Sequence, residues 1–194
     1  MNTPAQNALK PVLSFAPEVL LRAQDVRVAF FDVDGVLTDG GLFFSEAGET
    51  FKRFSVLDGH GLKLIQQIGI TPVVISGRDT PAVRARLAGL GLTRMHLGVA
   101  DKLGVAQAEL AVLGCDWEQA AAIGDDWPDL PLLCASAFAC APCNAHVEVK
   151  AVAHHVTLAR GGDGAVREFC DLLLTASGRY ASLLRGEQHS TDRA

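Results

Sequence analysis

The chain has 194 residues, enough for one α/β domain with a sizeable core, and 49% of them are hydrophobic, which excludes disorder for most of its length. Its net charge of −5 argues against a nucleic-acid-binding surface, which is normally basic. No apolar run reaches the about 20 residues that span a membrane, and no signal-peptide pattern opens the sequence, so we expect a cytoplasmic protein without nucleic-acid or membrane partners.

Hydrophobic patterning predicts three regions along the chain. Residues 1–25 form an N-terminal arm with a short helix at 17–23, residues 26–178 form the main domain, and the polar residues 179–194 form a flexible C-terminal tail. Within the domain, strands are expected at 27–31, 72–75, 94–97, 119–123, 137–140 and 155–156. Helices are expected at 58–68 with Asp58 as N-cap, at 80–89, 102–113, 144–150 and 165–176, and from Pro128.

The first strand is apolar on both faces, which is typical of a central strand in a parallel sheet. It ends in Asp32 and Asp34, and because strand side chains alternate, both carboxylates are expected on the same side of the chain. Gly35 then lets the backbone turn. Two neighbouring carboxylates at the end of a buried strand repel each other and lose hydration, so the pair indicates a bound cation or proton. The structural alternative is a strand that ends in an ordinary polar turn.

Two aromatic segments follow, at 42–44 and 50–54, around a turn that contains Gly48. This pattern predicts a β-hairpin that projects just beyond the two aspartates. Its phenylalanines, which cannot be buried on a sheet of their own, favour a flap or a contact between subunits. They are Phe43, Phe44, Phe51 and Phe54.

The rest of the domain alternates strand and helix, which predicts an α/β fold with a Rossmann-like parallel sheet and helices on both faces. The segments 39–76 and 76–102 are too short to hold a lid domain, so the fold is expected to be capless, with the hairpin as a flap after the first strand. In such sheets, functional groups collect at the carboxyl ends of the strands. An uncovered site of this kind accepts a large substrate or is covered by a neighbouring subunit.

Polar residues follow four successive strands and are therefore expected in one crevice. In chain order they are Asp32 and Asp34, Ser76 and Gly77, Lys102, and Asp125 and Asp126. Carboxylates are the hard oxygen ligands that Mg²⁺ prefers, and a metal lets an anionic aspartate approach an anionic phosphate. The Ser76 hydroxyl, the Gly77 amide and the Lys102 ammonium suit phosphate oxygens. The set predicts a Mg²⁺ and phosphate site, although each residue alone also fits a cap, a turn or a solvated surface.

The five cysteines, an odd number, fit a reducing compartment better than a disulfide framework. Cys140 and Cys143 form a Cys-Ala-Pro-Cys sequence that could act as a redox pair. A thioredoxin-like domain would carry such a pair early in the chain, and a zinc site would need a second pair, which the sequence lacks. A structural role is therefore preferred for both thiols.

These motifs, in this order, resemble those of the haloacid dehalogenase superfamily of phosphatases: Asp-x-Asp-Gly, then Ser, then Lys, then Gly-Asp-Asp-x-x-Asp, over residues 26–129. A narrower resemblance, to the family of 3-deoxy-D-manno-octulosonate 8-phosphate phosphatases, reaches residue 178. It rests on the segments 32–40, 54–59, 75–78 and 161–168. It implies Mg²⁺-dependent removal of phosphate from an eight-carbon sugar acid on the route to lipopolysaccharide, by a homotetramer whose hairpins and tails meet at neighbouring sites.

By this resemblance, Asp32 is the nucleophile and Asp34 the general acid and base. The metal ligands are Asp32, the main-chain carbonyl of Asp34, and Asp125. Ser76, Gly77 and Lys102 bind the phosphate, with Lys102 also counted among the catalytic groups. Arg78 faces the sugar carboxylate, which suits its planar fork.

One position departs from the family pattern: Leu57 stands where relatives often carry Arg. Lys52 and Arg53 are nearby cations that could replace it. Three other functions stay open: a sialic-acid-type 9-phosphate phosphatase, a phosphoacceptor signalling domain and a catalytically silent protein of the same fold. A phosphoacceptor domain would lack Asp34 and be shorter, and the intact aspartates argue against a silent protein.

Overall fold

The computed structural model describes residues 9–46 and 48–190. The main sheet has six strands in the order β5-β4-β1-β6-β7-β8, and every pairing is parallel. The strands are β1 (Val28–Phe31), β4 (Thr71–Ser76), β5 (Met95–Leu97), β6 (Ala120–Ile123), β7 (Phe138–Ala141) and β8 (His155–Val156). The expected Rossmann-like parallel sheet is confirmed.

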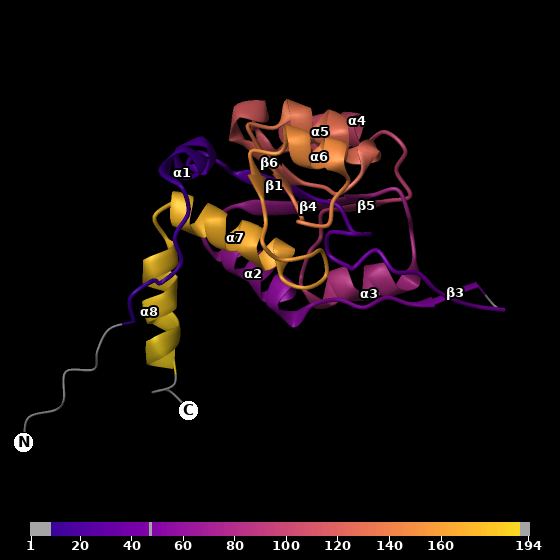
Figure 1. Ribbon diagram of the computed structural model, residues 1–194, viewed down its shortest axis with the longest axis horizontal. Helices are drawn as coiled ribbons and strands as arrows, with labels where there is room; N and C mark the ends of the chain where they lie inside the picture. Colours follow the sequence, from indigo (N-terminus) through magenta and orange to yellow (C-terminus); the bar gives the residue numbers. More distant parts are fainter. Residues whose placement is uncertain (1–8, 47, 191–194) are drawn as a thin grey trace, which may run out of the picture.

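Helices cover both faces of the sheet (Figure 1). One face carries α1 (Pro17–Ala23), α2 (Val56–Gln67), α3 (Pro81–Gly89) and α7 (Ala165–Ala176). The other carries α4 (Lys102–Leu113), α5 (Leu130–Ala135) and α6 (Val147–Val152), and two short 3₁₀ turns lie at Trp117–Gln119 and Trp127–Asp129. Phe31 packs into the first layer and Phe30 into the second, each with 0% exposure. This burial on both faces explains why β1 is continuously apolar.

β1 lies at the centre of the sheet, where its end meets the ends of two neighbours. Phe31 is paired with Val74 of β4 on one side and with Ile123 of β6 on the other. Asp32, the next residue, donates its backbone N–H to the carbonyl of Ile123 at 3.2 Å. The register therefore brings the residues that follow β1, β4 and β6 to one edge of the sheet.

The start of α2 differs from the expectation that Asp58 caps the helix. Ser55 is the N-cap, and its side chain accepts the backbone N–H of Asp58. Asp58 is instead 1% exposed, and its carboxylate accepts the backbone N–H of Arg167 at 2.8 Å and of Gly164 at 3.4 Å. A carboxylate is well placed there, because the first N–H groups of a helix lack partners within it. Asp58 thus joins α2 to the start of α7.

The hairpin consists of β2 (Phe43–Ser45) and β3 (Gly48–Phe51), and it forms a separate antiparallel sheet that projects from the body of the domain (Figure 1). The rings of Phe43 and Phe51 stack with their centroids 4.4 Å apart. Phe43, Phe44 and Phe51 are 40%, 66% and 56% exposed. The projecting flap is confirmed, except that Phe54 packs against the main core rather than on the flap.

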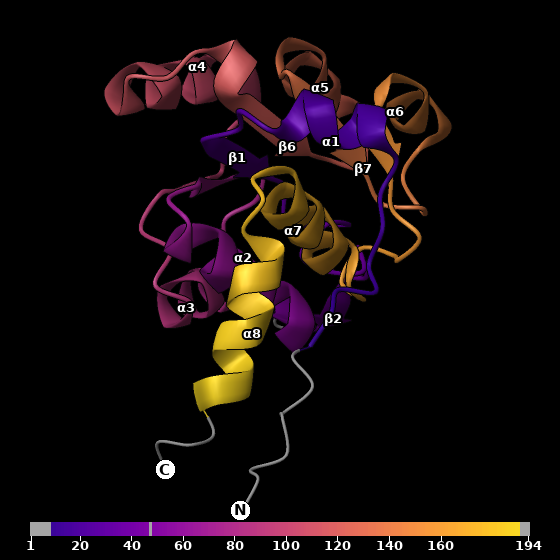
Figure 2. The ribbon, with the colours of Figure 1, turned by 90° about the vertical axis from the view of Figure 1, so that its left-hand side faces the viewer.

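The C-terminal segment differs from the expected flexible tail, because Tyr180–Ser190 form helix α8. Figure 2, like Figure 1, shows α8 descending from the end of α7. Tyr180 and Leu183 pack against the main core, and Leu183 and Leu184 face Leu64 of α2 across a small cavity. In the sequence, Tyr180, Leu183 and Leu184 are spaced one helical turn apart, and this spacing indicates a helix even though the segment is mostly polar. None of the helices formed by the described residues has the length and apolar character needed to cross a membrane.

Candidate active site

A cavity of about 290 Å³ opens at the carboxyl ends of β1, β4 and β6. It is lined by every polar residue that the strand ends were expected to bring together, and by Arg78, Pro128 and Asp129: Asp32, Asp34, Ser76, Gly77, Arg78, Lys102, Asp125, Asp126, Pro128 and Asp129. The strand-end rule thus locates the site, and the contacts within it determine what each group can do.

Lys102, the first residue of α4, joins two carboxylates at the bottom of the cavity. Its Nζ atom lies 2.6 Å from Oδ1 of Asp32 and 2.6 Å from Oδ1 of Asp129, and the residue is 7% exposed. Burial alone would lower the pKa of Lys102, but the two carboxylates outweigh it and raise the pKa. Lys102 is therefore a fixed positive charge beside Asp32.

Asp129 has a second role that sequence analysis did not assign. Its Oδ2 atom accepts the backbone N–H groups of Asp125 at 3.0 Å and of Asp126 at 3.3 Å. One carboxylate therefore holds both Lys102 and the loop that follows β6. Asp129 ends the Gly-Asp-Asp-x-x-Asp motif, which was the signal for it in the sequence.

Asp32, Asp125 and Asp129 each offer one carboxylate oxygen, and these atoms lie within 4.8 Å of one another. Burial, then the nearby carboxylates, raises the pKa of Asp125 to about 7. Burial and Asp129 likewise raise the pKa of Asp32 to about 7, against the opposing effect of Lys102. Asp32 and Asp125 are hard oxygen donors that resist ionisation side by side, and a small divalent cation would offset their repulsion.

Gly35 allows the loop after β1 to lie close to Asp125, which follows β6. Its φ angle is +92°, and a Cβ atom there would lie 2.0 Å from Oδ2 of Asp125. Gly161, from the loop before α7, is equally confined, because a Cβ atom on it would lie 1.7 Å from the carbonyl oxygen of Gly35. A larger residue at position 35 would displace the Asp125 carboxylate, and a larger residue at position 161 would displace the loop that carries Asp32 and Asp34.

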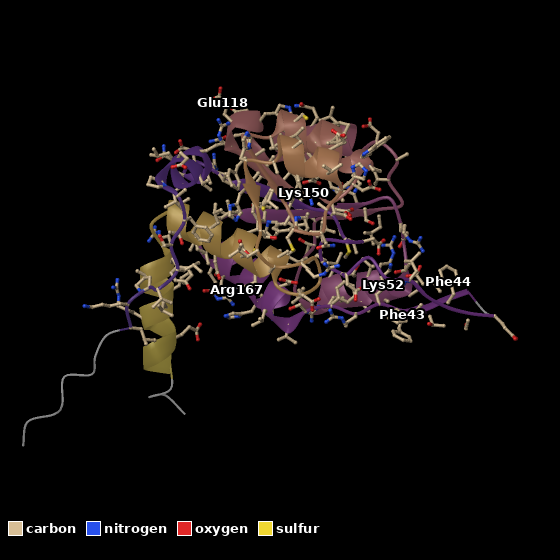
Figure 3. The ribbon with its side chains drawn as sticks, in the orientation of Figure 1. Phe43, Phe44, Lys52, Glu118, Lys150 and Arg167 are labelled. Carbon is tan, nitrogen blue, oxygen red and sulfur yellow. The ribbon has the colours of Figure 1, made fainter. Side chains whose placement is uncertain are left out.

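The Asp34 carboxylate turns away from the other three and faces the hairpin. It pairs with Nζ of Lys52, and Nε of Arg78 lies 3.7 Å from its Oδ2. Glu49 of β3 pairs with the same two cations: Oε1 lies 2.8 Å from Nζ of Lys52, and Oε2 pairs with Nη2 of Arg78. Figure 3 shows Lys52 between the hairpin phenylalanines and the body of the domain. The hairpin therefore supplies charged groups to the site.

Glu49 was not predicted as a site residue, and Lys52 was considered only as a replacement for a missing arginine. The Lys52 side chain is 1% exposed, so its burial depends on how the hairpin leans on the domain. In the sequence, the sign that the hairpin contributes to the site was the presence of two charged residues, Glu49 and Lys52, beside Phe51. Arg53 pairs with Asp39 and Asp163 and makes no such contact with Asp34.

Ser76 is 2% exposed, and its hydroxyl oxygen accepts the backbone N–H of Arg78 at 3.2 Å. The turn after β4 is thereby fixed next to the carboxylates. Asp79, which could have tethered Arg78, pairs with Arg84 instead. Leu57 is 60% exposed on the first turn of α2 and is absent from the cavity lining.

Two other features carry no comparable chemistry. A larger cavity, of about 500 Å³, lies between the N-terminal arm, β8 and α7, and much of its lining is apolar, including Leu13, Phe15 and Val19. Cys140 is fully buried in β7, which raises the pKa of its thiol well above the usual value. A thiol that resists ionisation is a poor redox nucleophile, which agrees with a structural role.

The parallel sheet, with five aspartates and a buried lysine lining the cavity at its strand ends, defines a haloacid dehalogenase-like hydrolase. The family model for haloacid dehalogenase-like hydrolases matches residues 95–169. Among curated proteins, the 3-deoxy-D-manno-octulosonate 8-phosphate phosphatase of Yersinia pestis is 40% identical over 161 residues, which are 83% of this chain and 86% of the relative. The chain belongs to the 3-deoxy-D-manno-octulosonate 8-phosphate phosphatase family.

Solved structures agree with this assignment. The enzyme of that name from Moraxella catarrhalis, in complex with magnesium ion, phosphate ion and a KDO molecule, matches with a TM-score of 0.83 and 35% identity over 86% of this chain and 96% of that one. The cobalt-bound phosphatase from Haemophilus influenzae matches with a TM-score of 0.80 and 39% identity over 82% and 93% of the two chains. One of these relatives therefore holds magnesium and the other cobalt.

Proposed function

We propose that the protein hydrolyses 3-deoxy-D-manno-octulosonate 8-phosphate to the free sugar acid and inorganic phosphate, in the synthesis of lipopolysaccharide precursors. The observation that carries the proposal is the group of Asp32, Asp125 and Asp129 around Lys102 at the strand ends, in a chain of this family. A sialic-acid-type 9-phosphate substrate remains the alternative, because these residues address phosphate and metal rather than the sugar.

Mg²⁺ fits the donor set as its cofactor. Asp32, Asp125 and the main-chain carbonyl of Asp34 would hold it, and Asp129 would support the loop of Asp125 from behind. Asp129 suits that supporting role because Lys102 and two backbone amides already occupy its oxygens. When bound, the metal neutralises charge between the aspartates and the phosphate.

The chemistry proposed for the chain has two steps. In the first, a carboxylate oxygen of Asp32 attacks phosphorus, the bond from phosphorus to the sugar oxygen breaks, and Asp34 gives that oxygen a proton. In the second, Asp34 takes a proton from water, the water oxygen attacks the aspartyl-phosphate, and Asp32 is released with inorganic phosphate. Ser76, the Gly77 N–H and Lys102 hold the phosphate oxygens throughout.

Arg78 is proposed to bind the sugar carboxylate. Its guanidinium is 43% exposed beside Asp34, so it can reach a group that lies beyond the phosphate. A charge-assisted hydrogen bond contributes about 1.5–3 kcal/mol, or roughly 10–150-fold in kcat/KM, and exposure favours the lower end. Arg78→Ala should therefore remove much of the preference for an acidic phosphosugar while slow hydrolysis of an aryl phosphate persists.

The test is steady-state phosphate release from a panel of phosphosugars at saturating Mg²⁺. The 8-phosphate of the eight-carbon sugar acid should give the highest kcat/KM, above sialic acid 9-phosphate and neutral hexose phosphates. Addition of a chelator should abolish turnover and Mg²⁺ should restore it. Preference for the 9-phosphate would replace the substrate assignment, and absence of turnover on every phosphosugar would overturn the function.

Assembly is part of the proposal. The exposed Phe43, Phe44 and Phe51 form an apolar surface on a projecting hairpin, which suits a homo-oligomer, most simply a tetramer that covers the capless site. Light scattering should show the oligomer, and Phe44→Asp should weaken it; a fully active monomer would refute this. A reducing cytoplasmic compartment completes the proposal, because all five thiols are free.

A further inference from the structure

Glu49 occupies both cations that surround the Asp34 carboxylate. Its two oxygens pair separately, Oε1 with Lys52 and Oε2 with Arg78. The Glu49 side chain is 13% exposed, and Lys52, followed by Arg78, lowers its pKa, so the group is an anion at neutral pH. The cations next to the catalytic carboxylate are thus already paired before any sugar arrives.

The charges in this cluster balance. Lys52 and Arg78 contribute two positive charges, and Asp34 and Glu49 contribute two negative charges. Asp34 needs a proton before it can act as the general acid, so in the substrate complex Glu49 is the resident anion that meets the sugar carboxylate. Two carboxylates at the Arg78 guanidinium repel each other, so the sugar carboxylate and Glu49 compete for Arg78.

The contacts indicate which carboxylate leaves. Asp34 is held by Lys52, whose side chain is 1% exposed, and it lies 3.7 Å from Arg78. Glu49 pairs directly with Arg78, whose side chain is 43% exposed and open to a ligand. Glu49 also stands on the hairpin, outside the main sheet. The pair between Arg78 and Glu49 is therefore the one that a sugar carboxylate can replace, while Glu49 keeps Lys52.

We propose that Glu49 is an internal competitor for Arg78. When the sugar-acid substrate binds, its carboxylate replaces Glu49 at Arg78, and when the product leaves, Glu49 replaces the product carboxylate. The proposal rests on the proposed function for its substrate. Substrate and product carry the same carboxylate, so an enzyme that bound it without competition would retain its product. Glu49 returns to Arg78 and limits that retention.

The first test is Glu49→Gln, which keeps the shape and removes the charge. Because the glutamine carries no charge, Arg78 can bind the sugar carboxylate without competition. The KM for 3-deoxy-D-manno-octulosonate 8-phosphate should therefore fall about tenfold, which is the lower end of the range for a charge-assisted hydrogen bond because Arg78 is exposed. D-Arabinose 5-phosphate has the same phosphate end but no carboxylate. The ratio of its KM to that of the acid substrate should therefore rise about tenfold.

Three controls isolate the exchange. Glu46→Gln removes an exposed carboxylate from the same hairpin and should leave the KM ratio at its wild-type value. Glu49→Gln combined with Arg78→Ala should lose the gain, because the contact that Glu49 contests is absent. Free 3-deoxy-D-manno-octulosonate should inhibit Glu49→Gln with a KI about tenfold lower than wild type. A KM for the acid substrate that rises, or a ratio that does not change, would overturn the proposal.

A separate readout does not depend on the assigned substrate. D-Glucuronate should inhibit aryl phosphate hydrolysis more strongly in Glu49→Gln than in wild type, with D-glucose as the uncharged comparison. A lower KI for glucuronate without any turnover of the eight-carbon substrate would reject the proposed function but support the role of Glu49. An unchanged KI for glucuronate would reject that role even if the substrate is correct.

Discussion

The carboxylates of the active site should make the metal-free protein less stable as pH rises. The folded-state pKa of Asp125 is raised from 3.8 to about 7, and so is that of Asp32. Between about pH 4 and 7 the folded protein therefore binds more protons than the unfolded chain, and its free energy of unfolding falls as pH increases. Above about pH 7 both groups are charged, and the loss is complete.

The magnitude follows from the same values. A pKa raised from 3.8 to about 7 favours the protonated form of Asp125 by about 4 kcal/mol. Because Asp125 is partly exposed and shares its environment with Asp32, about half of that, or about 2 kcal/mol, is expected in practice. For a domain of this size the corresponding fall in Tm is about 4–8 °C.

The assay is thermal unfolding in chelator at pH 5 and pH 8, with and without added Mg²⁺ at pH 8. Wild type should unfold at a lower Tm at pH 8, and Mg²⁺ should restore most of the loss. Buried Asp58 and Asp171 also have raised pKa values and contribute with the same sign. Asp125→Asn is therefore the matched control, and its Tm should depend less on pH and on Mg²⁺. Equal pH dependence in the two proteins would refute the reasoning.

Three further variants test the proposed roles at the strand ends. Asp32→Asn should remove turnover but leave a folded protein by circular dichroism, and near-normal phosphate release would exclude the covalent step. Asp34→Asn should lower kcat on the order of 10²–10⁴-fold, as expected for a lost general acid and base; an unchanged kcat would assign Asp34 another role. Lys102→Met leaves Asp32 and Asp129 buried without their cation, so its free energy of unfolding in chelator should be about 3 kcal/mol below that of wild type, with a lower Tm. A Tm equal to or above that of wild type would show that the buried ion pairs contribute no net stability.

Much of the fold could be predicted because the hydrophobic pattern of each segment agrees with the position of that segment in the folded domain. Helix α7 has the bounds expected from the sequence, Ala165–Ala176, since its apolar face and its glycine-rich start both mark it. The strand ends could be predicted to converge because parallel strands share an edge. The structure accordingly brings Asp32, Ser76, Lys102 and Asp125 around one cavity.

The parts that were missed depend on how separate elements meet. Asp58 has the sequence signature of a helix cap, but its partners lie on α7, more than 100 residues away in the chain. Lys52 and Glu49 enter the site only because the hairpin leans toward Asp34. Helix α8 has a local signal in the spacing of Tyr180, Leu183 and Leu184, but their packing against the core and beside Leu64 of α2 is a tertiary contact that a polar segment does not predict. The role of Asp58, the position of Lys52 and Glu49, and the packing of α8 all depend on how separate elements pack together, and local sequence propensity does not describe that packing.

The close contacts of Gly35 with Asp125 and of Gly161 with Gly35 limit how this site can diverge. Three segments far apart in the sequence meet there: the Gly35 backbone contacts the Asp125 side chain on one side and the Gly161 backbone on the other, and glycine is already the smallest residue available. A smaller residue than glycine does not exist, and a larger residue at either position would shift the neighbouring carboxylates. Engineering of a new specificity should therefore start at the hairpin, where Glu49 and its neighbours can be exchanged without rebuilding the loops for which we propose the chemistry.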